Sequence, residues 1–106
     1  MNKSKPEDSQ DHFNILRVIQ NKPKSTQRDL ANDLGFSLGK LHYCLKALQE
    51  KGFVKIKNFR KSKNKINYIY VLTPQGITEK TNLTINFMKR KMKEYEELKK
   101  ELKSKK

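Results

Sequence analysis

The sequence has few of the residues that mark cross-linked, membrane-spanning or secreted proteins. Its single cysteine, Cys44, excludes an intramolecular disulfide and any site built from several cysteines, and it favours a reducing compartment. No apolar run approaches the ~18 residues that a membrane-spanning helix needs. No apolar stretch follows the lysines near the N-terminus, so no secretory signal is predicted. We therefore expect a cytoplasmic protein without a membrane partner.

Residues that carry catalysis are also scarce. With only 4 glycines the chain has no glycine-rich phosphate loop, and His12 and His42 fall on different predicted helices without the local carboxylates of a metal site. Asp29 and Asp33 share one helix face, where we interpret them as solvated charges rather than a catalytic pair. Cys44 falls on an inward face, which favours a small core residue over a redox sensor. We predict no enzyme, no catalytic residue, no cofactor and no metal site.

Apolar and acidic side chains are both in short supply. The 106 residues are 34% hydrophobic and include no tryptophan, which suits one small domain with an appended helix and a core that a partner chain would enlarge. Basic residues outnumber acidic ones by 25 to 11, giving a formal net charge of +14. This charge predicts a polyanionic partner, nucleic acid before an anionic membrane surface, and the alternative is a purely solubilising charge.

The excess charge is concentrated in the middle of the sequence. Residues 37–73 hold nine basic and one acidic side chain, a net charge of +8, against +1 for residues 1–36 and +5 for residues 74–106. A charge that served solubility alone has no reason to gather in one segment. The uneven distribution therefore favours nucleic acid as the partner.

Apolar periodicity predicts three short helices in the first half of the chain, after a disordered segment 1–7. Their expected ranges are about 8–22, 27–34 and 37–51, with Asp8 or Ser9, Thr26 and Ser37 as N-caps. Asp29 follows Thr26 at the spacing of a capping box, and Gly52 follows the third helix where a C-terminal glycine is favoured.

The second and third helices have the sequence form of a helix-turn-helix. Small Ala31 lets the two helices cross closely, Gly35 suits the tight turn, and Leu41 and Cys44 are apolar where the pair must pack. The second helix of such a motif, here 37–51, enters a DNA major groove. The DNA-contacting candidates on its outer face are Ser37, Leu38, Gly39, Lys40, His42, Tyr43 and Lys46. At the start of the preceding helix, Ser25, Thr26 and Gln27 are predicted to hold one phosphate.

Two runs rich in β-branched and aromatic residues, 53–59 and 66–73, flank a basic turn and predict a two-stranded hairpin. Three helices followed by such a hairpin make a winged helix-turn-helix, so we predict a mainly α fold with a small β-hairpin over residues 8–73. Within the wing, residues 59–66, Arg60 is the candidate for a narrow minor groove. Phosphate contacts are predicted for Lys61, Lys63 and Lys65, and the alternative is a solvated loop tip.

A long helix is predicted from residue 74 onward, because Thr73 suits the cap and Pro74 the first helical position. Its apolar residues recur at alternating spacings of four and three, which is the heptad pattern of a coiled coil. The predicted dimer interface comprises Ile77, Thr81, Thr84, Ile85, Met88, Met92, Tyr95, Leu98 and Leu102, with Lys91 as a charged position in the seam. We expect residues 74–106 to form a homodimer, and the alternatives are another oligomer or a helix folded back on its own domain.

Several segments together resemble the MarR-type winged-helix transcriptional regulators. They are STQRDLANDLGFS, LHYCLKALQEKGFVK with its L-x-x-L-x-x-K-G-F-V run, the basic hairpin, and YVLTPQGI with its L-T-P-x-G. The single N-terminal helix and the long C-terminal helix are similar to the small subgroup found near exopolysaccharide biosynthesis genes. The resemblance covers about residues 10–100 and implies a homodimer that binds a pseudo-palindromic operator and controls transcription.

This chain departs from the family pattern at its ends. MarR-type proteins commonly dimerise through both terminal helices and bind small phenolic ligands beside that interface. Here the N-terminal region is short and one long helix follows the wing, so the resemblance assigns no small-molecule effector. We interpret the chain as a sequence-specific regulator that binds double-stranded DNA. The alternatives are a winged-helix adaptor for another protein and an RNA-binding module, and the charge of residues 37–73 favours nucleic acid over the adaptor.

Overall fold

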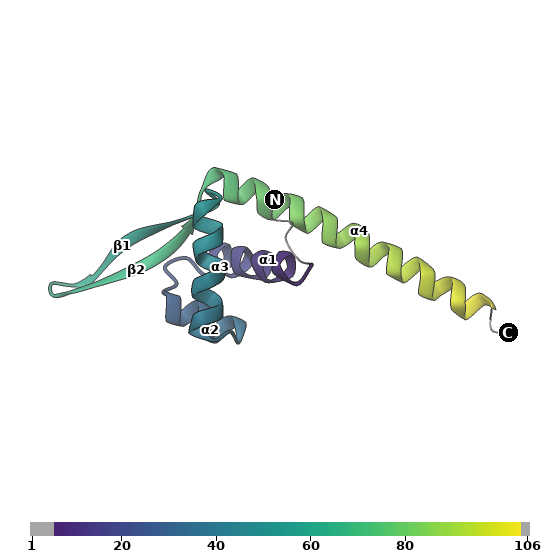
Figure 1. Cartoon of the computed structure of the whole chain (residues 1–106), viewed down its shortest axis with the longest axis horizontal. Coiled ribbons are helices and arrows are strands. Elements are labelled where there is room, and N and C mark those ends of the chain that lie inside the picture. Colours follow the sequence, from purple (N-terminus) through teal and green to yellow (C-terminus); the bar gives the residue numbers. More distant parts are fainter. Residues whose placement is uncertain (1–5, 105–106) are drawn as a thin grey trace.

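The computed structural model describes residues 6–104, without the side chains of residues 6–8 and 61. Its elements follow in the order α1 (Pro6–Asn21), α2 (Gln27–Leu34), α3 (Leu38–Glu50), β1 (Val54–Ser62), β2 (Lys65–Leu72) and α4 (Pro74–Ser104). The antiparallel hairpin β1–β2 and the long helix α4 extend to opposite sides of a body formed by α1, α2 and α3 (Figure 1). The predicted fold, a mainly α winged helix-turn-helix with a long C-terminal helix, is confirmed.

The core lies where the first three helices meet. Leu16 of α1, Leu30 of α2 and Leu41 of α3 have no exposed surface. Ala31 is 6% exposed at the crossing of α2 and α3, where its small side chain permits close approach. Cys44 is buried within the same cluster, so its predicted place in the core is confirmed.

Local sequence signals set the ends of α2 and α3. The Thr26 hydroxyl accepts a hydrogen bond from the Asp29 N–H at 3.2 Å, and the Asp29 carboxylate accepts one from the Thr26 N–H at 3.1 Å, which completes the predicted capping box. Ser37 caps α3 by accepting from the Lys40 N–H at 3.1 Å. Gly35 ends α2 in the left-handed region, at a φ of 69°. These predicted boundaries are confirmed.

The start of α1 differs from the prediction. The helix begins at Pro6 rather than near Asp8 or Ser9, because proline is well suited to the first helical position, where no N–H partner is required. Residues 6 and 7 are therefore helical and not part of a disordered segment, and residues 1–5 lie outside the described part of the chain.

The hairpin also differs, because its first strand is longer, its second begins and ends one residue earlier, and its turn is shorter than predicted. Arg60 pairs with Ile66 and Ser62 with Lys65, and a register shift between Arg60 and Ser62 accommodates the extra residue. The turn proper is reduced to residues 63–64. Arg60 and Lys61 thus belong to β1, since cross-strand pairing carries the ladder through polar residues that strand propensity alone assigns to a turn.

The start of α4 crosses directly over the start of β1. Thr73 donates its N–H to the Phe53 carbonyl oxygen at 3.0 Å, and its hydroxyl accepts from the Gly76 N–H at 3.0 Å. Gly76 is buried, and a Cβ added there would lie 2.0 Å from the Phe53 carbonyl oxygen. Gly76 therefore lies within the first turn of the helix and permits the close contact between α4 and β1.

Only the first half of α4 lies against the rest of the domain. The rings of Phe13 in α1 and Phe87 in α4 stack with their centroids 4.9 Å apart, and the partly buried Leu83 of α4 packs against the core. Beyond Phe87 the helix projects away from the body, and the molecule reaches 69 Å along its longest axis (Figure 1).

Replacing Gly76 with alanine tests the contact between α4 and β1. The Gly76→Ala variant should lose about 3 kcal/mol of unfolding free energy, because the new methyl group overlaps backbone that cannot rotate away. Gly39→Ala is the matched control, since a Cβ there meets no atom within 4 Å, and its stability should stay the same or rise by about 0.5 kcal/mol. Urea denaturation measures both, and equal stabilities would contradict the close contact.

Candidate nucleic-acid interface

The first turns of α3 expose a polar and cationic surface, called here the α3 surface. It is formed by the predicted residues Ser37, Leu38, Gly39, Lys40, His42, Tyr43 and Lys46, all of them exposed. Tyr43 is 66% exposed, whereas Leu41 and Leu45 on the opposite side are buried in the core. The open space at Gly39 leaves the helix backbone accessible to a bulky partner. This end of α3 is therefore free of cover by the described part of the chain.

Lys40 is held by an interaction that the sequence did not suggest. Its Nζ lies 3.2 Å from the Asp11 Oδ2 of α1 and 4.2 Å from the centre of the Phe36 ring. The lysine therefore leans toward α1 rather than straight outward from the α3 surface. Because its side chain is 47% exposed, this ion pair is weak enough for a competing anion to displace it.

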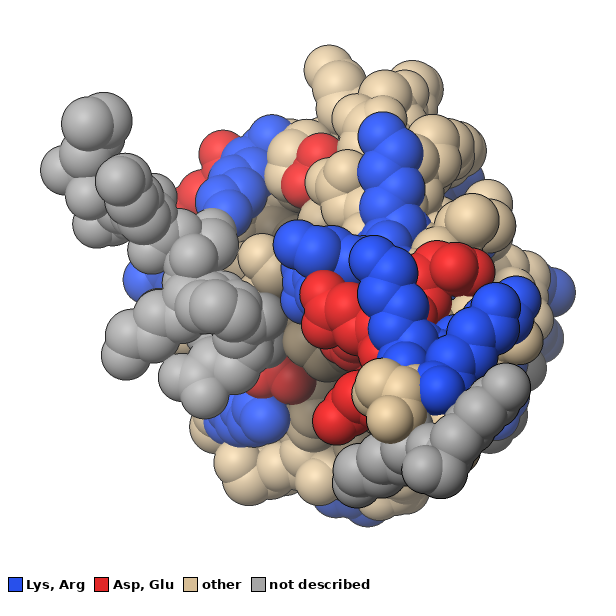
Figure 2. Space-filling model, turned by 90° about the vertical axis from the view of Figure 1, so that its right-hand side faces the viewer, with Lys and Arg blue, Asp and Glu red and all other residues tan. Residues whose placement is uncertain are grey.

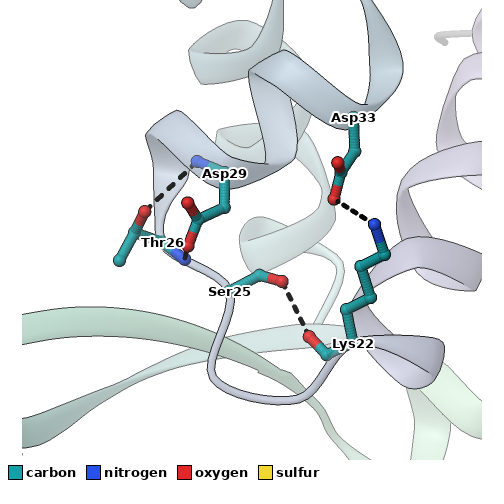
Figure 3. A network of polar contacts seen from close by, with 5 residues as sticks. All are labelled: Lys22, Ser25, Thr26, Asp29 and Asp33. Atoms are coloured by element: carbon teal, nitrogen blue, oxygen red, sulfur yellow. Dashed lines mark hydrogen bonds and ion pairs between the residues drawn. The ribbon is translucent and has the colours of Figure 1, made fainter.

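The start of α2 differs from the predicted phosphate site, and Ser25 is a correction. Ser25 is 5% exposed and its hydroxyl donates to the Lys22 carbonyl oxygen at 2.7 Å, so it points inward and has no proton to offer a phosphate. The Thr26 hydroxyl accepts a hydrogen bond from the Asp29 N–H, and the Asp29 carboxylate brings negative charge to the same helix end (Figure 3).

Asp33 further along α2 pairs with Lys22 at 3.1 Å, which joins this helix to the end of α1. Of the predicted trio, Gln27 is half-buried at the edge of the groove described below.

The wing presents its cations at and near the tip of the hairpin. Lys63 and Lys65 are exposed, and the Arg60 guanidinium donates to the Lys63 carbonyl oxygen at 3.3 Å, which braces the turn from one side. The side chain of Lys61 lies outside the described part of the structure. Arg60, Lys63 and Lys65 thus lie at or beside the turn of the hairpin, and their contact with DNA stays a prediction.

A groove of about 630 Å³ separates the start of α2 from β2. Three cationic residues line it, Lys24, Arg28 and Lys65, together with the aromatic side chains of Phe59 and Tyr68. The Lys24 Nζ lies 4.8 Å from the centre of the Phe59 ring. Asp29 lines the groove too, so its charge is mixed but predominantly positive.

One backbone hydrogen bond fixes the floor of this groove. Tyr70 of β2 donates its N–H to the Ser25 carbonyl oxygen at 3.3 Å, which ties the outer edge of the hairpin to the loop before α2. The N–H groups of Tyr68 and Ile66 point to the same edge, since alternate residues of a strand face the same side. Burial raises the pKa of the Tyr70 hydroxyl above its ordinary value of 10.0, so the phenol stays protonated and neutral.

Sequence reasoning missed Lys24, Arg28 and Tyr68 as members of a common surface. Lys24 and Arg28 flank the predicted phosphate site, and their positive charge was a usable signal. The sequence held no signal that they would lie near Tyr68, because this proximity depends on how the hairpin docks on the loop between α1 and α2. Lys24 reaches this place through a left-handed backbone conformation, with a φ of 70°.

The predicted seam of α4 is uncovered. Exposed fractions run from 45% to 77% for Ile77, Ile85, Met88, Met92, Tyr95, Leu98 and Leu102. Thr81 is exposed and Thr84 half-buried, and Lys91 pairs with Glu94 of the same helix at 3.6 Å. The helix packs on α1 through Phe87 and does not bend back to cover its own seam.

Charges of both signs are intermixed at the end of the molecule from which α4 projects. Figure 2 shows acidic side chains between basic ones on this face. It contrasts with residues 37–73, which hold a single acidic side chain. Among residues 6–104, no helix is long and apolar enough to cross a bilayer, and no cluster of metal-ligating side chains is found.

Comparison with known proteins places the first part of this architecture in a described class. Residues 12–55 match a family described as winged helix-turn-helix DNA-binding, and these residues span α1 after its first turn, α2, α3 and the start of β1. No curated protein matches the chain.

Solved structures share the fold at low sequence identity. The PcaV transcriptional regulator from Streptomyces coelicolor, solved with its natural ligand, aligns with a TM-score of 0.67 and 11% identity over 90% of this chain and 74% of PcaV. A mutant MarR from E. coli complexed with operator DNA aligns with a TM-score of 0.61 and 25% identity over 69% of this chain and 51% of MarR. FabT from Streptococcus pneumoniae in complex with DNA aligns with a TM-score of 0.62 and 20% identity over 82% of this chain and 59% of FabT. The chain therefore spans between about half and three quarters of the length of these proteins.

The capping role of Thr26 can be tested without any ligand. Thr26→Ala should lower the unfolding free energy by about 1 kcal/mol, because the Asp29 N–H loses its acceptor at the start of α2. Thr78→Ala is the control, since the Thr78 hydroxyl only donates back to the Pro74 carbonyl oxygen on an exposed face, and it should change stability by less than about 0.5 kcal/mol. Thermal unfolding measures both, and an unaffected Thr26 variant would contradict the stabilising role of this cap.

Proposed function

We propose that the chain is a MarR-type transcriptional regulator that binds specific double-stranded DNA as a homodimer. The observation that carries the proposal is the exposed α3 surface, with Lys40 and Lys46 as its cations, on a winged helix-turn-helix fold. The second helix of such a motif is the element that enters the major groove and contacts base edges from its first turns.

Each residue of the α3 surface has a role that its chemistry supports. Lys46 is a cation within reach of a phosphate or a guanine edge, and His42 and Tyr43 supply hydrogen-bonding groups to bases or phosphates. Leu38 is a partner for a thymine methyl group, and Gly39 lets the helix approach the groove closely. Lys40 joins them only when it leaves Asp11.

The wing and the groove extend this contact beyond the major groove. Arg60 is the candidate for the minor groove, and Lys63 and Lys65 for the flanking phosphates, with Lys61 alongside them in sequence. Lys24 and Arg28 add two cations between the wing and α2. The backbone of one DNA strand has to pass between a helix in the major groove and a wing in the minor groove, and the groove offers positive charge along such a path.

The comparisons support DNA over the alternatives. MarR from E. coli and FabT from Streptococcus pneumoniae, which share the fold, were both solved with DNA bound. An adaptor for another protein would not need a segment of net charge +8. The exposed apolar side chains of that segment stand among its cations, whereas those of α4 form a separate stripe. An RNA-binding module predicts a preference for RNA, which the same binding assay measures.

The homodimer is supported by the uncovered seam of α4. Its apolar side chains form a stripe, interrupted by Lys91, that a monomer leaves in water, and a second copy presents the same stripe. Membership of the small exopolysaccharide-associated subgroup and a cytoplasmic location stay predictions from the sequence, and no small-molecule effector is assigned.

Binding to duplex DNA across a salt series tests the proposal. For each of Lys46→Gln and Lys63→Gln, the slope of log K against log salt concentration should fall by about 0.9 per subunit, because one phosphate contact is lost. Lys93→Gln removes the same charge from the projecting part of α4 and should leave the slope unchanged. Selection of bound sequences from a random duplex library should return an inverted repeat.

Two results would reject this function. One is equal affinity for all duplex sequences, which would remove sequence-specific regulation. The other is tighter binding to RNA than to duplex DNA at the same salt concentration, which would favour the RNA-binding alternative.

The ion pair between Lys40 and Asp11 generates a separate prediction. Asp11→Asn should tighten duplex binding about threefold at low salt, because the released Lys40 ammonium becomes available to a phosphate. Asp33→Asn is the matched control, since it makes the same charge change and breaks an ion pair of 3.1 Å with Lys22, which lies outside the α3 surface. Gel-shift titration measures both affinities. An equal gain in the two variants would show that the change in net charge, and not the release of Lys40, tightens binding.

A further inference from the structure

The uncovered seam of α4 is unequal along its length. Its first part, Ile77 to Thr84, contributes one isoleucine and two threonines, whereas its last part contributes Tyr95, Leu98 and Leu102. The most exposed of these side chains is Leu102 at 77%. Two of the first three seam positions are therefore small, and this end is called here the small end, whereas the last three positions are large.

The two threonines of the small end have their hydroxyls satisfied within the helix. The Thr81 hydroxyl donates to the Ile77 carbonyl oxygen at 3.1 Å, and the Thr84 hydroxyl donates to the Lys80 carbonyl oxygen at 2.7 Å. Each threonine thus offers a methyl group to a partner without leaving a buried hydroxyl unpaired. These positions accept a large apolar side chain from outside but provide little volume themselves.

We propose that two copies of the chain pair through α4 in antiparallel orientation, so that the small end of each seam receives the large end of the other. This inference rests on the proposed homodimer and adds its geometry. In the two layers that contain threonine, a small side chain then faces a large one, which fills these layers evenly. The seam residues Ile77, Thr81, Thr84 and Met88 then face, respectively, the partner's Leu102, the partner's Leu98, the partner's Tyr95 and the partner's Lys91.

This register also places complementary residues on both flanks of the seam. In an antiparallel pair, the residues that directly precede position a of the two heptads face each other on one flank of the seam. The residues that directly follow position d face each other on the other flank. Lys80 then lies beside the partner's Glu101, and Ile85 beside the partner's Met92. Ile85 and Met92 are 45% and 64% exposed in the single chain, so this contact covers apolar surface that otherwise stays in water.

The parallel orientation fits the same seam less well. It places Lys91 directly against the partner's Lys91, so two like charges share one layer of the interface, and it stacks each threonine on its own copy. Its gain is an ion pair between Glu94 and the partner's Lys99, but exposed ion pairs contribute little, and Glu94 already pairs with Lys91 at 3.6 Å. The antiparallel pair instead sets Lys91 against the flexible Met88 of the partner, from which its ammonium can reach water.

The orientation has a consequence for DNA. In the antiparallel pair the two winged-helix bodies lie at opposite ends of the helix pair. At a rise of 1.5 Å per residue, Ile77 and Leu102 are about 38 Å apart along the axis. This distance separates the starts of the two α4 helices, from which the DNA-binding bodies extend, and it is close to the spacing of about 34–36 Å between half-sites on one face of DNA. An inverted repeat with half-sites about one turn apart fits this arrangement.

Cysteine cross-linking of the full chain tests the orientation. The double variant Thr81→Cys, Leu98→Cys should form a covalent dimer under mild oxidation, because the new thiol at position 81 of each chain faces the new thiol at position 98 of the partner. In the antiparallel pair, the single variant Leu98→Cys should give at least about tenfold less dimer, since its two copies lie about 26 Å apart and a disulfide needs Cα atoms within about 7 Å. The wild-type chain is the control for Cys44, which is 2% exposed.

Each other outcome overturns the inference. Efficient cross-linking of Leu98→Cys alone would show a parallel pair. A dimer by sedimentation whose double variant does not cross-link would show another interface or register. A monomer would overturn the homodimer as well, whereas duplex binding measured on the same sample reports separately on the DNA-binding part of the proposed function.

A charge exchange gives a second test that adds no thiol. Lys80→Glu should weaken the dimer about two- to fivefold in its dissociation constant, because it places two carboxylates side by side, and adding Glu101→Lys in the same chain should restore it. Residues 80 and 101 are far apart in one chain and in a parallel pair. Failure of the second substitution to rescue the first would therefore count against the antiparallel register.

Discussion

The junction between β1 and α4 is the constraint on which the arrangement of the molecule depends. Phe53 follows α3, and its carbonyl oxygen accepts from Thr73 while Gly76 passes within van der Waals reach of it. This one backbone contact fixes the end of α3, the root of the wing and the start of α4 relative to each other. A side chain at position 76 would force them apart, so the glycine sets the direction in which both the wing and α4 leave the body.

From this junction the candidate nucleic-acid interface is assembled out of segments that meet only in three dimensions. The α3 surface is held outward because Leu41 and Leu45 are buried behind it. The wing is held at an angle to it by the Tyr70–Ser25 hydrogen bond, which also creates the groove with Lys24 and Arg28. The groove between α2 and the wing is lined by three cations, while the acidic residues of α2 are engaged in a cap and an ion pair.

The long helix serves two surfaces at once. Phe87 faces α1, whereas Met88, one residue on and thus about 100° further around the axis, faces solvent. The helix can therefore pack on its own domain and still present an apolar stripe to a second copy. In the proposed dimer, the same helix that holds the wing root would also set the distance between two DNA-binding bodies.

The sequence by itself determined the elements whose signals are local. Thr26 with Asp29, Ser37, Gly35 and Pro74 fix helix ends through contacts within a few residues, and the apolar periods fix which faces are buried. Only the tertiary structure decided that Ser25 points inward, that Lys40 pairs with Asp11, that the ladder continues past Arg60, and that Lys24 meets the wing. Those outcomes depend on partners distant in the chain, whose approach is set by packing of whole elements and not by the residues beside them.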